Sequence, residues 1–307
     1  MTQEPTLLFE TLHGSRAYGL AREGSDTDLK GVIVGPRAWY FGLEPGPEQV
    51  ELSADHVRWE LRKLLRLAAA SNPTVIEVLF ADDADHVTVT PAGERLLAAR
   101  DGMLSLKVAD TFGGYAHGQL ARIQRHRRWL LEPPAAPPTR AQFDLPERAT
   151  LPKDQLGAAT RMLETGELDE AELPTGFLAR LANERRFRAA QKEWGQFVGW
   201  QKHRNAKRAA LEAQHGYDTK HAMHLVRLGR MAVEILEHGE VRVRRDDREE
   251  LLAIRDGAWS YDTLMEHAEA LRQQREQAKR TSSLPKAPDA GRLDALCQQL
   301  IAETFAC

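Results

Sequence analysis

The chain has 307 residues, of which 42% are hydrophobic and 28% are charged, with a mean hydropathy of −0.49. This is the composition of a globular protein that folds as one large domain or as two ordinary ones. The sequence contains no run of about 18 apolar residues and no basic and apolar secretory signal at its start, so neither a membrane-spanning nor a secreted protein is expected. The two cysteines, Cys297 and Cys307, have neither metal-binding nor disulfide spacing, and we expect a cytoplasmic protein with no disulfide partner.

Charge is distributed unevenly along the chain, whose formal net charge is −3. Residues 1–105 carry 10 Lys and Arg against 16 Asp and Glu, whereas the remainder carries 32 against 29. Within the remainder, residues 183–208 hold eight basic residues and two acidic ones. An acidic N-terminal part suits metal binding and a basic helical part suits a polyanion, although ordinary solvated surfaces explain these counts equally well.

The first third of the chain has a mixed pattern of strands and helices. The apolar period changes to that of a helix from Glu60 onward. Asn72 followed by Pro73 has the pattern of an N-cap and a first helical residue, which predicts a helix through Phe80. Apolar runs bounded by turn residues predict short strands at Leu7–Leu12, Leu29–Val34, near Val50–Arg58 and at Val87–Thr90.

From Leu106 onward the pattern is almost wholly helical. Prolines across residues 132–152 predict a loop, and a second polar break at 282–290 precedes a short C-terminal helix. The predicted fold class is α+β, with a small mixed-sheet core at 1–105 followed by a mainly helical domain at 106–307 that contains the Pro-rich loop at about 132–152. The elements predicted in this second part are long helices at 183–214, 219–238 and 261–280, and an edge strand at Val241–Val243.

The pattern with the most chemical content is His13-Gly14-Ser15-Arg16-Ala17-Tyr18-Gly19-Leu20, followed by Ser25-Asp26-Thr27-Asp28-Leu29-Lys30-Gly31. A Gly-Ser turn after a strand lets the backbone approach a phosphate closely, because Gly14 has no Cβ, and the Ser15 hydroxyl can then hold that phosphate. Asp26 and Asp28 stand at i and i+2, so on an extended strand both carboxylates face the same side.

Two carboxylates on one side of a strand, beside the oxygens of a phosphate, suit Mg²⁺ or Mn²⁺. This layout serves phosphoryl chemistry with two ions, in which one activates the attacking oxygen and the other stabilises the leaving group. A Gly-Ser pair or an Asp-x-Asp pair alone is usually structural. Their combination between two apolar strands therefore favours a functional site for metal ions and a phosphate.

The combination resembles the signature of polymerase-β-like nucleotidyltransferases, in which Gly-Ser is followed after a short spacer by Asp-x-Asp. Thr27 is a departure, since that superfamily usually has an apolar residue between the two acids. The resemblance implies a third carboxylate from a neighbouring strand. We expect Asp55 to be this metal ligand and to act as a base toward the acceptor hydroxyl, with Glu60 and Glu51 as the alternatives.

A closer resemblance is to the RNA-repair-associated polymerase-β-like nucleotidyltransferases, the RlaP family. The segments that carry it are the two quoted above, Asn72–Phe80 and Gly216–Arg227, and it extends from residue 9 to about residue 257. It implies transfer of a nucleoside monophosphate from an NTP bound with two metal ions, in a setting linked to RNA end repair, and it does not fix the acceptor. We expect an RNA end as the acceptor and ATP as the NTP. The alternatives are nucleotidylation of a protein or a tRNA in a toxin-like role, and a non-catalytic NTP-binding regulator, against which the paired Asp26 and Asp28 argue.

The segment Gly216–Arg227 also has a physical interpretation. Asp218 or Thr219 can cap a helix, which places Lys220 in its first turns, where free N–H groups and positive potential suit a phosphate. The resemblance implies a lysine from the helical part on the NTP tail, so we expect Lys220 on the β- and γ-phosphates. An ordinary capped helix with a solvated lysine is the competing interpretation.

Three further residues are expected at the nucleotide. Arg16 is expected to neutralise the leaving pyrophosphate together with Lys220, and Tyr217 to stack on the base. Arg227 lies about two turns beyond Lys220 and therefore on a similar face of the predicted helix.

RNA is an expected partner because two predicted helical segments are basic. Trp194 and Trp200 interleave with the second segment and could stack bases, although aromatic residues in a long helix are more often core. The basic residues are His117, Arg122, Arg125, His126, Arg127 and Arg128 in the first segment, and Arg185, Arg186, Arg188, Lys202, Arg204, Lys207 and Arg208 in the second.

Overall fold

The computed structural model describes residues 4–148, 153–167 and 175–306, and the side chains of residues 153, 154, 175, 207 and 208 lie outside this description. The chain forms two compact units, residues 1–124 with 214–307 and residues 125–213. The boundary predicted at residue 105 separates strand-rich from helical sequence and stays a prediction. The compact units divide the chain differently because helices near the C-terminus pack with the sheet region.

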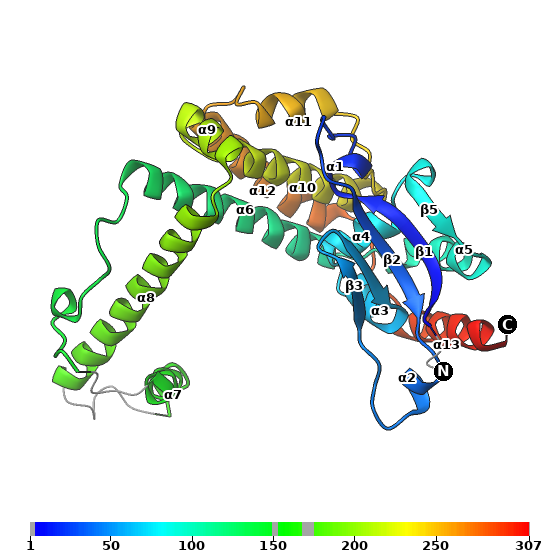
Figure 1. Cartoon of the computed structure of the whole chain (residues 1–307), viewed down its shortest axis with the longest axis horizontal. Coiled ribbons are helices and arrows are strands. Elements are labelled where there is room, and N and C mark those ends of the chain that lie inside the picture. The colour runs from blue at the N-terminus through cyan, green and yellow to red at the C-terminus, as the bar shows by residue number, and fades with distance from the viewer. Residues whose placement is uncertain (1–3, 149–152, 168–174, 307) are drawn as a thin grey trace. The chain divides into compact units, whose positions relative to one another are not determined.

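The first unit contains a five-stranded mixed sheet in the order β3-β4-β2-β1-β5 (Figure 1). β1 pairs antiparallel with β2 and β5, β3 and β4 form an antiparallel hairpin, and β2 runs parallel to β4. Because β2 and β4 are parallel, both strands begin at the same edge of the sheet. The strands are β1 Thr6–His13, β2 Asp28–Val34, β3 Gln49–Ser53, β4 His56–Glu60 and β5 His86–Val89.

Short helices connect the strands, and their caps follow the sequence signals. The Glu60 carboxylate caps α3 by accepting from the Arg62 N–H, and the Asn72 side chain caps α4 by accepting from the Val75 N–H, as predicted for Asn72-Pro73. The short elements are α1 Gly14–Ala17, α2 Ala38–Phe41, α3 Leu61–Ala69, α4 Pro73–Leu79, η1 Asp83–Asp85, α5 Pro91–Ala98 and η2 Arg100–Met103.

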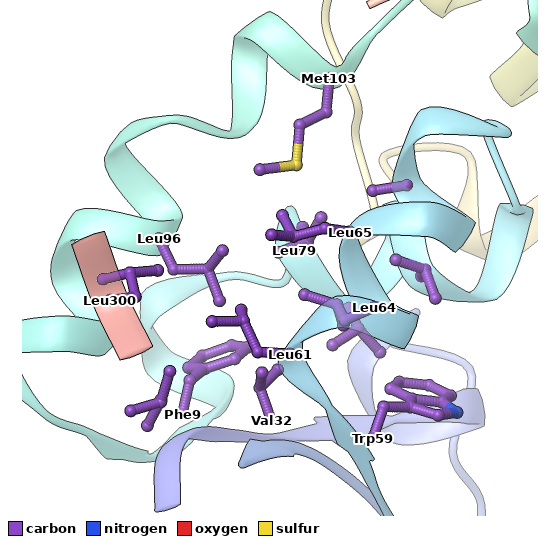
Figure 2. Close-up of a cluster of buried hydrophobic side chains, with 14 of the residues drawn as sticks. Phe9, Val32, Trp59, Leu61, Leu64, Leu65, Leu79, Leu96, Met103 and Leu300 are labelled. Atoms are coloured by element: carbon purple, nitrogen blue, oxygen red, sulfur yellow. The ribbon is translucent and has the colours of Figure 1, made fainter. Parts of the chain in front are cut away.

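One face of the sheet packs against α3, α4, α5 and the C-terminal helix α13 (Ala290–Ala306) in a hydrophobic core (Figure 2). Adjacent strands contribute Phe9, Val32 and Trp59, which are neighbours in the strand register. Leu300 of α13 reaches the same core and is completely buried. The predicted C-terminal helix therefore packs on the sheet, and it is longer than expected, with 17 residues.

Four helices make up the rest of the first unit: the N-terminal part of α6 (Lys107–Leu131), α10 (Thr219–His238), α11 (Arg248–Arg255) and α12 (Tyr261–Thr281). The bounds predicted for the second and fourth agree with the structure within a residue. Their core includes Ala17, Tyr18 and Leu20 from the segment after β1. α10 therefore packs directly on the segment that contains the Gly-Ser turn.

The second unit contains the end of α6, η3 (Arg140–Phe143), α7 (Lys153–Glu164), α8 (Thr175–His203) and α9 (Ala206–His215). The helix predicted at 183–214 is divided at Arg204 and Asn205 and starts earlier. Trp200 packs on Trp129 and Phe197, which supports the core interpretation of these aromatic residues. Among the described basic residues Arg128 pairs with Glu193 and Arg204 with Glu212, whereas the side chains of Lys207 and Arg208 lie outside the description.

Two predicted elements are wrong. The single strand near Val50–Arg58 is a hairpin, because Ala54 and Asp55 form a turn between β3 and β4. Val241–Val243 is not a strand; Val243 is buried among the helices, and Arg245 makes one backbone hydrogen bond to the Tyr18 carbonyl, at 3.2 Å. The fold class is nevertheless the predicted α+β, and no helix in the described ranges has the length and apolarity needed to cross a membrane.

Replacing Leu300 by alanine tests whether α13 belongs to the sheet core. The free energy of unfolding is expected to fall by about 2–5 kcal/mol, because a fully buried leucine leaves a cavity. Leu43→Ala is the control, since Leu43 is fully exposed and its loss should change stability by less than about 0.5 kcal/mol. Equal denaturation midpoints for the two variants would contradict this packing.

Candidate active site

The Gly-Ser turn lies directly against the second carboxylate of the Asp-x-Asp pair. His13 ends β1 opposite Asp28, which begins β2, so the turn at Gly14 starts beside Asp28. Gly14 has a φ of +67°, and a Cβ added there would stand 2.3 Å from Oδ2 of Asp28. Glycine is therefore required at this position both by the left-handed backbone and by the closeness of the carboxylate.

Arg16 holds the loop that carries Asp26. Its guanidinium donates to the backbone carbonyls of Ser25, at 3.0 Å, and of Asp26, at 3.3 Å. Asp26 precedes β2 and its side chain is exposed. The described contacts of Arg16 therefore hold the backbone at Ser25 and Asp26, and its predicted contact with pyrophosphate stays a prediction.

Asp55 lies at the same edge of the sheet as Asp28. Leu29 pairs with His56 in the parallel register, and the Leu29 N–H donates to the Asp55 carbonyl at 2.8 Å. The residues that precede this pair, Asp28 and Asp55, are thus neighbours where β2 and β4 begin. Asp55 is exposed in the hairpin turn, which is compatible with the predicted third ligand.

The two alternatives to Asp55 are less well placed. Glu60 pairs in register with Ile33 and so lies five residues along β2 from Asp28, roughly 16 Å away at the rise of a strand. Its carboxylate is also already hydrogen-bonded, because it caps α3 and accepts from the Tyr40 hydroxyl at 2.8 Å. Glu51 lies on the edge strand β3 and accepts from Gln49.

The three acids predicted to bind metal differ from other acids of the sheet region in the hydrogen bonds that their side chains accept. No described residue hydrogen-bonds to the side chain of Asp26, Asp28 or Asp55, whereas Glu10 accepts from both His56, at 2.7 Å, and Arg58, at 2.8 Å. Within the described ranges the three motif carboxylates do not form a group whose ligand atoms all lie within 4.8 Å of one another. Asp26 and Asp55 are exposed and Asp28 is half-buried, so their carboxylates remain accessible to a ligand.

The helix predicted to carry the lysine begins as expected. The Asp218 carboxylate caps α10 by accepting from the His221 N–H at 3.0 Å, and Lys220 is half-buried in the first turn. Burial, with the positive charges of Arg227 and Lys220, lowers the pKa of His224 well below its ordinary value, so this histidine is neutral at pH 7. His221, whose N–H is held by this cap, is also buried.

Two of the predicted nucleotide ligands are core residues. Tyr217 is completely buried, and its hydroxyl donates to the Trp259 carbonyl at 2.8 Å, so its ring cannot stack on a base. Arg227 is only 4% exposed and its guanidinium pairs with Glu77. Arg227 was assigned by its spacing from Lys220, and spacing along a helix does not distinguish the face that packs on the sheet region from the face toward a ligand.

Beneath the turn lies a buried network of hydrogen bonds and ion pairs around Glu77 that the sequence analysis does not predict. The Glu77 carboxylate, 3% exposed, accepts from the Tyr18 hydroxyl at 2.5 Å and from Arg227 at 2.5 Å, and lies 3.3 Å from Nε2 of His13. Burial by itself raises the pKa of Glu77, but the charge of Arg227 and the hydrogen bonds from His13 and Tyr18 lower it to about 2. A sequence signal existed, because Glu77 is the one acid in the apolar helix Pro73–Leu79.

Residues 18–22, which precede Asp26, are hydrogen-bonded to both ends of α11 and to the residues that flank this helix. Four contacts hold consecutive parts of residues 18–22, so the conformation of the motif loop depends on a chain segment more than 200 residues away. The contacts are Arg245 N–H to the Tyr18 carbonyl, Arg248 to the Gly19 carbonyl, Arg255 to the Leu20 carbonyl, and Arg22 to both carboxylate oxygens of Asp256, at 2.7 and 2.6 Å.

Comparison with known families identifies the part of the chain that carries these motifs. Residues 2–131 match the RlaP family. This family is described as the RNA repair pathway DNA polymerase beta family, and the predicted resemblance is confirmed over these residues. The matched part includes the Gly-Ser turn, the three acids and Glu77, whereas the resemblance expected for Gly216–Arg227 stays a prediction. A match to a polymerase β-type family implies nucleotidyltransferase chemistry for the RlaP-like part.

One curated relative aligns with part of the chain. The protein YcgL of Bacillus subtilis (strain 168), described as uncharacterized, is 34% identical over 90 residues, which are 28% of this chain and 35% of that protein. The aligned part thus spans about a third of the relative. No solved structure matches the chain significantly.

Replacing Gly14 by alanine tests the contact between the turn and Asp28. A Cβ at this position displaces the Asp28 carboxylate, so nucleotidyl transfer is expected to fall on the order of a hundredfold. Gly24→Ala is the matched control, since Gly24 also has a positive φ, of +74°, but a Cβ there would meet nothing within 4 Å. Equal losses of transfer in the two variants would mean that backbone strain alone matters.

The pKa of Glu77 predicts an acid-sensitive contribution to stability. Because the folded-state pKa, about 2, lies below the ordinary value of 4.5, the contribution is complete above pH 4.5 and is lost as the pH falls toward 2. The stability of the wild type should therefore fall more steeply with decreasing pH than that of Glu77→Gln, by on the order of 1 kcal/mol for each pH unit in this window. Urea denaturation between pH 5 and 2.5 measures both slopes, and identical slopes would contradict this prediction.

Proposed function

We propose that the protein transfers a nucleoside monophosphate from an NTP to an acceptor in a reaction that depends on divalent cations, with an RNA end as the acceptor. The observation that carries this proposal is the Asp28 carboxylate lying against Gly14, because it puts a cation ligand beside a turn suited to phosphate. Asp26 and Asp55 at the same edge, without hydrogen-bonding partners among the described residues, support it. The RlaP match over residues 2–131 supports the reaction class and the RNA-repair setting.

The donor set fits a hard divalent cation. Asp26, Asp28 and Asp55 would hold two Mg²⁺ or Mn²⁺ ions, since carboxylate oxygens are the ligands these ions prefer and no described side chain competes for them. When bound, the ions supply activation of the attacking oxygen and charge stabilisation at the leaving group. Asp55, exposed in the hairpin turn, accepts the proton of the acceptor hydroxyl.

The remaining groups orient the NTP. The Gly14 backbone and the Ser15 hydroxyl bind the phosphate tail, and Lys220, in the first turn of α10, binds the β- and γ-phosphates. ATP is the proposed donor. Arg227 and Tyr217 take no part in binding, because both are buried in the core.

The experiment incubates the pure protein with each α-labelled NTP, with Mg²⁺ or Mn²⁺, and with RNAs that end in 3′-hydroxyl, 3′-phosphate or 5′-phosphate groups. Label on RNA that disappears with Asp28→Asn supports the proposal and identifies the nucleotide. Label on a protein or on tRNA would instead favour the toxin-like alternative. Binding of an NTP without any labelled product would favour a non-catalytic regulator.

The assignment of the third carboxylate makes a separate prediction. Asp28→Asn and Asp55→Asn should each lower transfer by on the order of a hundredfold or more, because each removes a charged cation ligand. Glu51→Gln is the control, since Glu51 lies on the neighbouring edge strand and already accepts from Gln49. A larger loss with Glu51→Gln than with Asp55→Asn, measured as kcat/KM for the NTP, would reverse the assignment.

A further inference from the structure

We propose that Glu77 is a positioning residue that holds both ends of the phosphate-binding turn with one carboxylate and fixes that turn relative to α10. The inference rests on the proposed function, since it concerns how the site for the NTP phosphates is shaped. Glu77 itself lies beneath the turn and is too buried to touch a nucleotide.

The two contacts of Oε2 of Glu77 fall at the two ends of α1. His13 is the N-cap residue of α1 and Tyr18 is its C-cap residue, so Gly14–Ala17 lie between them. The Tyr18 hydroxyl is 2.5 Å from this oxygen and Nε2 of His13 is 3.3 Å from it. The hydroxyl and the imidazole are also 3.3 Å from each other, which closes a triangle of polar contacts under the turn. The backbone that carries Ser15 is thus held at both ends.

The other carboxylate oxygen connects this turn to α10. Arg227 donates to Oε1 of Glu77 at 2.5 Å, and its guanidinium lies over the Tyr18 ring, 3.7 Å from the centroid. Arg227 follows Lys220 by seven residues on the same continuous helix, about two turns. Because an α-helix is rigid over this length, the ion pair fixes where the first turn of α10 lies relative to Gly14 and Ser15.

The energetics favour a positioning role over a purely stabilising one. A buried ion pair is costly to desolvate, and an apolar pair of similar volume is often as stable or more so. In addition, Nε of Arg227 is buried with no hydrogen-bond partner in the described part of the chain. The network has these energetic costs and contacts both ends of a four-residue turn. Its role is therefore to fix the geometry of that turn.

The test compares two tyrosines that each donate to a buried glutamate. Tyr18→Phe removes the hydroxyl at Glu77, and Tyr40→Phe removes the hydroxyl that donates to Glu60, at the far end of the sheet strands. Both variants lose one hydrogen bond to a charged group, but only the first loses a contact with the turn. Glu77→Gln, which keeps the size of the side chain and weakens both ends of the turn, is the second variant.

Three measurements are made on the full chain: the Kd of Mg²⁺·ATP by calorimetry, steady-state kcat and KM for the NTP, and hydrogen exchange of the peptide that spans Gly14–Ala17 without nucleotide. For Tyr18→Phe, Kd and KM should rise roughly tenfold with a smaller change in kcat, and exchange at the turn should be faster. Glu77→Gln should show a larger effect in the same direction. Tyr40→Phe should keep wild-type values of all three.

Two results overturn the inference in different ways. If the wild type binds ATP and both Tyr18→Phe and Glu77→Gln bind it equally well, with unchanged exchange at the turn, the positioning role is wrong while the proposed function stands. If the wild type binds no NTP, the proposed function fails, and the exchange rates alone then decide whether Glu77 holds the turn.

Discussion

The structure of the candidate site depends on the buried charge of Glu77. A carboxylate that is 3% exposed is tolerated only where cationic and hydrogen-bonding partners compensate it, and Arg227, Tyr18 and His13 provide them from three separate parts of the first unit. These partners lie on α10 and at the two ends of α1. Satisfying one buried charge therefore brings together the strand, the turn and the helix that form the site.

The acids of the sheet region fall into two groups, those that are buried and paired and those whose carboxylates have no described hydrogen-bonding partner. Glu10, Glu60 and Glu77 are buried and paired with side chains of neighbouring elements. Asp28 and Asp55 come together because β2 and β4 are parallel and begin at the same edge, where no described side chain hydrogen-bonds to them. Carboxylates without such partners can ligate a hard divalent cation. This contrast is the physical basis for assigning the edge to metal and nucleotide chemistry.

Local signals predicted local structure well. The apolar runs of β1 and β2, the cap at Asn72 and the bounds of α10 and α12 depend on interactions within a few residues, and the structure confirms them. The errors fall where long-range packing decides. Val241–Val243 has the composition of a strand, yet Val243 is buried among helices, and the hairpin at Ala54 and Asp55 interrupts a run that appeared continuous.

The sequence alone determined the chemistry that is possible at this site: a Gly-Ser turn between two strands, two alternating acids after it, and the family that such a turn and acids resemble. Only the tertiary structure decided which residues lie where they could serve that chemistry. Asp55 became a neighbour of Asp28 through parallel pairing, Arg227 and Tyr217 proved to be core residues, and Glu77 emerged as the residue that holds the turn. The physical reason is that a motif is encoded in contiguous residues, whereas Glu77 is paired with residues 59 and 150 positions away, Tyr18 and Arg227.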